Sequence, residues 1–171
     1  MLSTETKYHA SFVIDNIQFT VIATESGIRN IIFNSEDTDN LSEKYRVNPN
    51  DPRLHSAYFQ LQEYFNRERR KFNLPLEIEG TEFQKSVWHE LLKIPFGQTI
   101  SYQTLAIRLG DKKLIRAVAN ANGLNPVPIV IPCHRVIGAD GSMVGYGGGI
   151  ELKEKLLTLE GSRTMELFNL E

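Results

Sequence analysis

Cysteine is almost absent from this 171-residue chain, and its scarcity excludes several classes of protein. The single cysteine, Cys133, cannot form an internal disulfide, which rules out a small secreted scaffold held together by disulfides. It also rules out a zinc module built from several cysteines. The sequence has no apolar run of about 18 residues, so no segment is predicted to span a membrane.

The sequence also lacks a targeting signal and a large excess of charge. Its first residues, MLSTETKYHASF, have neither the basic flank nor the apolar run of a signal peptide. We therefore expect an intracellular protein, cytoplasmic in a prokaryote and nuclear only in a eukaryote. The net charge of −2, taken alone, argues against a nucleic-acid partner.

The charge is unevenly distributed, because residues 101–135 have five basic side chains against the single acidic Asp111. The basic residues are Arg108, Lys112, Lys113, Arg116 and Arg135. A local basic patch can attract phosphate even when the whole chain is close to neutral. A solvated helix face would explain the same charges.

The first half of the chain predicts a β-meander followed by one helix. The predicted strands are residues 12–14, 17–23 and 28–33, with Asp15-Asn16 as the first turn. Residues 34–50 predict a loop, and apolar residues at helical spacing predict a helix over 52–68. Residues 74–78 resemble an edge strand, since Pro75 cannot donate within a central ladder. We find no catalytic or metal-binding pattern in this half.

The composition changes at Gly80, where we place a boundary between domains 1–80 and 81–171. Thr81 and Gln84 match a capping box, so a helix is predicted to begin there. Ser101 can cap a second helix that ends at Gly110.

A third helix is predicted to follow, with a basic face. Lys112, Arg116 and Asn120 recur on one side of it. The residues predicted for its other side are Ile115, Val118, Ala119 and Asn122. Two short helices joined by a glycine-containing turn, the second of them basic, favour a helix-turn-helix.

The segment that contains Cys133 has three prolines within a short apolar run, which would hold the thiol in a preset geometry. An ordinary thiol, with a pKa of about 8.5, is mostly protonated at neutral pH and needs a base to become nucleophilic. His134 is adjacent. Neighbouring residues on an extended strand face opposite sides, however, so contact requires a turn or a bridging water. A buried cysteine without a chemical role is the alternative.

Two features beyond this segment point to chemistry. The glycine-rich loop 145–149 would let backbone amides approach a ligand closely. Glu160 ends a helix predicted over residues 151–159, where the helix dipole disfavours an anion. A carboxylate that orients His134 would complete an activated cysteine nucleophile.

Residues 81–161 closely resemble the O6-alkylguanine-DNA alkyltransferases, or methylated-DNA–protein-cysteine methyltransferases. The matching motifs are Phe83-Gln84 with Val87-Trp88, Ile100-Ser101-Tyr102, Arg116-Ala117-Val118, Asn125-Pro126-Val127-Pro128, Pro132-Cys133-His134-Arg135-Val136 and Leu157 to Gly161. The resemblance implies an α+β fold: a small ribonuclease H-like N-terminal domain, then a winged helix-turn-helix C-terminal domain with the active site. It implies DNA repair by direct reversal, in which an alkyl group passes irreversibly from flipped-out O6-alkylguanine, or O4-alkylthymine, to Cys133.

The resemblance also implies roles for individual residues. His134 would take the thiol proton through a water, Glu160 would orient the imidazole, and Asn125 would brace the turn before the reactive segment. Arg116 would fill the gap left by the flipped base, and Tyr102 would donate a proton to the departing guanine. Ala117 and Lys112 would contact DNA. The residues implied around the base are Tyr146, Gly147, Val136, Pro128 and Asn122. The carbonyls of Cys133 and Val136 would accept from the amino group of the base.

The expected partner is double-stranded DNA that contains O6-alkylguanine, and the expected state is a monomer without a metal, a cofactor or a membrane contact. One alternative is a non-catalytic protein that recognises alkylated DNA, although such relatives replace the reactive cysteine. Two others are a transcriptional regulator that uses residues 101–123 and a thiol hydrolase with a Cys-His-Glu arrangement.

Overall fold

The computed structural model describes residues 6–34 and 41–162, which fall into two units, Met1–Glu79 and Gly80–Glu171. The first unit contains an antiparallel sheet of β1 (Tyr8–Ile14), β2 (Ile17–Ala23) and β3 (Ile28–Phe33), in that order. Asp15 and Asn16 join β1 to β2 with φ angles of 52° and 62°. Two residues with positive φ suit a two-residue hairpin turn, which confirms the predicted turn. The predicted second and third strands are confirmed, whereas the first begins at Tyr8 rather than at Phe12.

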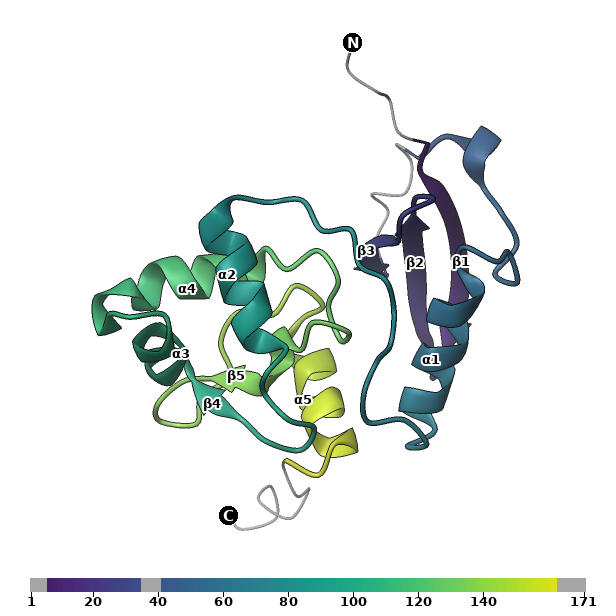
Figure 1. The fold of residues 1–171 in the computed structure, drawn as a ribbon. Helices are drawn as coiled ribbons and strands as arrows, with labels where there is room; N and C mark the ends of the chain where they lie inside the picture. The colour runs from purple at the N-terminus through teal and green to yellow at the C-terminus, as the bar shows by residue number, and fades with distance from the viewer. Residues whose placement is uncertain (1–5, 35–40, 163–171) are drawn as a thin grey trace. The chain divides into compact units, whose positions relative to one another are not determined.

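Helix α1 (His55–Phe65) packs on one face of this sheet (Figure 1). The ring centroids of Phe12 and Tyr58 are 4.9 Å apart, and those of Phe19 and Phe65 are 5.7 Å apart. The helix is shorter than the predicted 52–68, because residues before it form a turn in which the Asp51 carboxylate accepts from the Arg53 amide.

The rest of the first unit is irregular. The prediction of an edge strand over 74–78 is wrong, since Leu76 forms only an isolated bridge with Ile28. Within the predicted loop 34–50, residues 35–40 lie outside the described part of the chain, and Glu43–Tyr45 form a short 3₁₀ turn, η2.

The second unit begins with α2 (Glu82–Leu91), whose start is the predicted capping box. The Thr81 hydroxyl accepts from the Gln84 amide at 3.2 Å, and the Gln84 side chain accepts from the Thr81 amide at 2.8 Å. Trp88 is buried in this helix, and its indole N–H donates to the Ala121 carbonyl at 2.9 Å. This bond ties α2 to α4 (Ile115–Gly123).

The predicted helix pair is also present. Ser101 caps α3 (Tyr102–Arg108) by accepting from the Thr104 amide, and Gly110 allows the sharp turn with a φ of 110°. A 3₁₀ turn, η3 (Lys112–Leu114), then leads into α4. The buried side of α4 differs from the prediction, because Ala121 is buried beside Val118 and Asn122. Ile115 is 37% exposed and Ala119 is only partly covered, since packing against α2 and α3 sets the rotation of the helix.

The reactive segment follows α4 and leads into a small second sheet. Strand β4 (Ile100–Ser101) pairs in parallel with β5 (Val136–Ile137). Between α4 and β5 lies the 3₁₀ turn η4 (Cys133–Arg135), and α5 (Ile150–Leu159) completes the unit. The α+β fold class is confirmed. Within the described residues, no helix is long and apolar enough to cross a membrane.

Candidate active site

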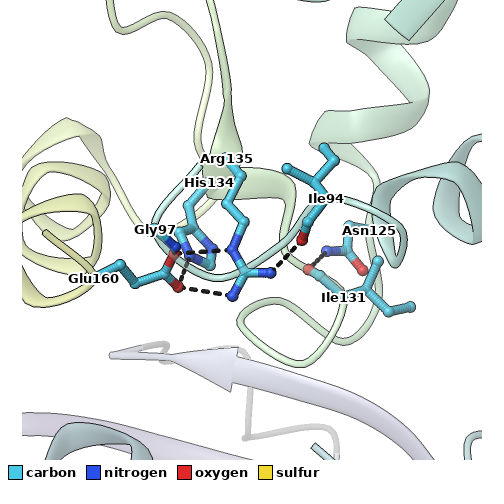
Figure 2. Close-up of polar contacts among 7 residues, drawn as sticks. All are labelled: Ile94, Gly97, Asn125, Ile131, His134, Arg135 and Glu160. Carbon is cyan, nitrogen blue, oxygen red and sulfur yellow. Dashed lines mark hydrogen bonds and ion pairs between the residues drawn. The ribbon is translucent and has the colours of Figure 1, made fainter. Parts of the chain in front are cut away.

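A braced loop positions Cys133. The Asn125 side chain donates to the Ile131 carbonyl at 2.7 Å (Figure 2). It also accepts from the Val127 amide at 3.0 Å. Pro132, with φ −82° and ψ 63°, makes a tight turn in which the Cys133 amide donates to the Ile131 carbonyl at 2.8 Å. Ile129 has a φ of 73°, which is costly for a β-branched residue and persists only where the surroundings impose it. The loop therefore holds the cysteine in one defined place.

Cys133 is buried, with 4% of its surface exposed. Burial raises the pKa of its thiol to about 11, although a hydrogen bond with Asn125 and the charge of Lys153 act in the opposite direction. The thiol is therefore protonated at neutral pH. Within the described residues no hydrogen bond joins its sulfur to the imidazole of His134, because Nε2 is bonded to Glu160 and Nδ1 has no partner. The turn at η4 does not by itself bring the thiol and the imidazole into a hydrogen bond.

His134 is fully buried, and its Nε2 lies 2.7 Å from Glu160 Oε1 (Figure 2). Burial raises the pKa of Glu160, but hydrogen bonds from His134 and Arg135 lower it more strongly, to about 2. The carboxylate is thus ionised and can only accept, so the imidazole proton must be on Nε2. The Nδ1 atom is left with a lone pair and is buried without a hydrogen-bond partner among the described residues. Nδ1 is therefore the available base.

The same carboxylate also binds a buried arginine. Arg135 donates from Nε to Glu160 Oε2 at 2.9 Å and from Nη2 to Oε1 at 3.0 Å, while its Nη1 donates to the Ile94 carbonyl at 2.6 Å. The Gly97 amide donates to Oε2 at 3.2 Å. Burial lowers the pKa of His134, and the Arg135 charge adds to this effect while Glu160 opposes it. The imidazole is consequently held neutral and in one orientation.

The burial of Arg135 corrects the predicted basic patch. Its side chain is 8% exposed and its guanidinium is paired with Glu160, so its charge is not available to a phosphate. Arg108 lies 3.8 Å from Glu90, which offsets part of its charge. Arg108 at the end of α3 is exposed, as are Lys112, Lys113 and Arg116 around the start of α4. The positive surface is therefore smaller than the sequence indicated, and it lies around the end of α3 and the start of α4.

The structure brings three further predicted residues, Tyr102, Asn122 and Tyr146, close to Cys133 or His134. Tyr102 is buried, and its hydroxyl donates to the Val144 carbonyl at 3.1 Å. Asn122 contacts both the Tyr102 hydroxyl and the Cys133 carbonyl. The Tyr146 ring lies edge-on to His134, with the centroids 6.5 Å apart.

The other predicted residues differ in burial, and two of the predicted carbonyl acceptors already accept hydrogen bonds within the protein. Pro128 and Val136 are buried, and Gly147 is exposed. The Val136 carbonyl already accepts from Lys153, and the Cys133 carbonyl from Asn122, so neither is wholly reserved for a base. Ala117, Arg116 and Lys112 are exposed in η3 and the first turn of α4.

Sequence reasoning missed Lys153. It is fully buried on α5 and donates from Nζ to the carbonyls of Val136 at 2.5 Å and Val144 at 3.3 Å. A signal was present, because Lys153, Leu156 and Glu160 are spaced at i, i+3 and i+7, which places them on one helix face. A lysine that shares a face with a buried leucine and a candidate catalytic carboxylate is a candidate for burial near the site.

Two family models match nearly the whole described chain. Residues 82–162 match the model of the 6-O-methylguanine DNA methyltransferase DNA-binding domain. Residues 18–78 match the model of the ribonuclease-like domain of the same enzymes.

Individual relatives agree with these models. A methylated-DNA–protein-cysteine methyltransferase of Methanosarcina acetivorans is 50% identical over 113 residues, which cover 66% of this chain and 72% of the relative. The protein of that name from Mycobacterium tuberculosis is 49% identical over 115 residues, covering 67% and 70% of the two chains. The crystal structure of Mycobacterium tuberculosis OGT in complex with DNA superposes with a TM-score of 0.80 at 38% identity, covering 91% of this chain and 93% of that one.

Proposed function

Since this chain belongs to the 6-O-methylguanine DNA methyltransferase family, we propose that it repairs DNA by moving an alkyl group from a damaged base to Cys133. One observation carries the assignment of the acceptor. The relatives are named for transfer to a protein cysteine, and this chain contains one cysteine. Its partner is DNA, and we propose O6-alkylguanine in a duplex as the substrate, with O4-alkylthymine as a second one. We assign the reaction to the domain of residues 81–171 and expect a monomer to suffice.

The proposed chemistry begins with removal of the thiol proton. His134 Nδ1 takes it through a bridging water, and Glu160 stabilises the imidazolium that forms. The Cys133 sulfur then attacks the alkyl carbon. The bond from that carbon to guanine O6 breaks, and its electron pair leaves with the base. A low dielectric around the buried imidazole strengthens its interaction with the Glu160 carboxylate.

The base must leave the duplex before it can reach a buried thiol. Extruding a paired base costs a few kcal/mol, and contacts that occupy the vacated space offset this cost. We propose that Arg116, exposed near the start of α4, enters the stack, while Lys112 and Ala117 face the backbone. Asn125 would keep the turn before the reactive segment in place, and Tyr146, Gly147, Pro128 and Val136 would surround the base.

The product would be a thioether on Cys133. A thioether lacks an ionisable proton and is a poor leaving group, and the chain has no second cysteine to take the alkyl group from Cys133. Each molecule is therefore proposed to act once, without turnover.

The direct test is the intact mass of the protein after incubation with duplex DNA that carries O6-methylguanine. We expect a stoichiometric gain of one methylene equivalent, about 14 Da, located on the Cys133 peptide. An undamaged duplex of the same sequence serves as the control and should leave the mass unchanged. Tight binding to the lesion without a mass change would contradict the transfer and favour a non-catalytic recognition protein. Neither binding nor a mass change would favour a regulator or a hydrolase.

The rate of transfer should not depend on pH between about 6.5 and 8.5. His134 is neutral over this range because its pKa is lowered, and the thiol is protonated because its pKa is raised to about 11. The base therefore takes the proton during the reaction, and the rate falls only when the pH drops below the lowered pKa of His134. Single-turnover rates across this range measure the dependence.

A different profile would contradict this mechanism. If the reaction used only the small fraction of thiol that is already ionised, the rate would rise roughly tenfold for each pH unit. A His89→Gln variant is the matched control, because His89 is exposed on α2. Its profile should coincide with that of the unaltered protein.

A further inference from the structure

Asn122 is a buried polar residue on α4, with 2% of its surface exposed, and the reaction proposed above does not use its side chain. Its Nδ2 lies 3.4 Å from the Tyr102 hydroxyl oxygen and 3.4 Å from the Cys133 carbonyl oxygen. A carbonyl can only accept, so the amide nitrogen must be the atom that faces Cys133. The amide thereby links the hydroxyl of Tyr102 to the backbone of the proposed alkyl acceptor.

The rest of the Asn122 amide is not satisfied by the protein. Its Oδ1 atom is buried and has no hydrogen-bond partner among the described residues. Leaving a buried polar atom unpaired is costly, so an apolar side chain of similar size would be the more stable choice for a purely structural position. This cost indicates that Asn122 contributes to the site through the groups it does contact.

The environment of Tyr102 shows what that contribution is. Its hydroxyl donates to the Val144 carbonyl, so the oxygen is free to accept from Asn122 Nδ2. Burial and the neighbouring Cys133 raise the pKa of Tyr102 to about 12, and the hydrogen bond from Asn122 lowers it. The Lys153 ammonium, which also donates to the Val144 carbonyl, lies 5.8 Å from the centre of the Tyr102 ring. Asn122 and Lys153 therefore both favour negative charge on the phenol oxygen.

We propose that Asn122 is a positioning residue that acts through Tyr102 and stabilises the phenolate formed when Tyr102 protonates the departing guanine. The inference rests on the proposed function. As the alkyl carbon moves from guanine O6 to the Cys133 sulfur, the base receives the electron pair of the broken bond. With the base bound, the Tyr102 hydroxyl gives up its hydrogen bond to the Val144 carbonyl and donates to the base instead. Its O–H bond then breaks toward the base, and the electron pair stays on the phenol oxygen, where Asn122 Nδ2 donates. The proton held by His134 balances the phenolate charge.

A double-mutant cycle tests this role. We expect Asn122→Leu to slow single-turnover methyl transfer roughly tenfold at saturating protein, because a hydrogen bond to a developing charge is lost. Tyr102→Phe removes the hydroxyl on which Asn122 acts. In that background, Asn122→Leu should change the rate by no more than about twofold.

The outcomes separate the possible explanations. Equal slowing in both backgrounds would assign Asn122 to structure alone and overturn the proposal, as would an unchanged rate in the single variant. If Asn122→Leu fails to fold, Asn122→Ala in the same two backgrounds gives the same comparison without added bulk. Failure of the unaltered protein to gain a methyl group would refute the proposed function instead, so the two failures are distinguishable.

Discussion

Cys133→Ser is expected to abolish alkyl transfer while leaving the protein able to bind a duplex that contains the lesion. A serine hydroxyl is far less acidic than a thiol, so His134 cannot generate a comparable nucleophile from it. The loss should be complete, because the chain has no second cysteine to accept the group. The variant should show no mass gain under conditions in which the unaltered protein is fully alkylated.

DNA binding provides the control for this variant. Fluorescence anisotropy with the lesion-containing duplex should give an affinity close to that of the unaltered protein, because the exposed basic residues at the start of α4 are unchanged. A gain of about 14 Da in the Cys133→Ser protein would place the acceptor on another residue and refute the assignment.

Glu160→Gln is expected to cause the second large effect, a loss of both activity and stability. The ionised carboxylate accepts from His134, from Gly97 and twice from Arg135. A glutamine amide has one acceptor oxygen and places an N–H group against one of these donors. Breaking a buried ion pair on one side leaves Arg135 without its counter-ion, which costs about 3–5 kcal/mol of unfolding free energy.

The activity should fall by at least about 100-fold, for a reason that concerns the proton on His134. If the glutamine amide donates to Nε2, the imidazole proton moves to Nδ1, and Nδ1 can no longer act as the base. Single-turnover rates and urea unfolding measure the two effects. Glu151→Gln is the matched control, because Glu151 is exposed in the first turn of α5. It should lose no more than about 1 kcal/mol and keep its rate. A Glu160→Gln protein with normal rate and stability would contradict the role of the carboxylate.

The pH dependence of unfolding provides an independent check on Glu160. Its pKa in the folded protein is about 2, against an ordinary value of 4.5, so the folded state favours the ionised form. The resulting stabilisation of about 3 kcal/mol is fully present above pH 4.5 and is lost as the pH falls toward 2. Glu160→Gln should lack this part of the acid-induced loss, and its unfolding free energy should change less over that interval.

Much of the local structure was predictable because its causes lie in adjacent residues. The alternation of β1 and β2, the Asp15-Asn16 turn, the capping box at Thr81 and the cap at Ser101 all depend on neighbours a few positions apart. The prediction of a strand over 74–78 was wrong because this segment pairs with β3 through a single bridge, between Leu76 and Ile28. Pro75, as expected, donates no hydrogen bond there.

The candidate nucleophile and its partners were also recognisable from sequence, because Pro-Cys-His-Arg-Val and a following helix that ends in glutamate form a specific pattern. The tertiary structure alone decided how these groups share their charges. The carboxylate of Glu160 accepts hydrogen bonds from Arg135 and from the Gly97 amide, which lie in distant parts of the chain. Because the carboxylate is ionised, it accepts the Nε2 proton of His134 and leaves the lone pair on Nδ1. The rotation of α4 likewise determines that Asn122 faces Tyr102. Local pattern specifies which groups are available, whereas protonation and pairing depend on burial and on distances between segments that only packing brings together.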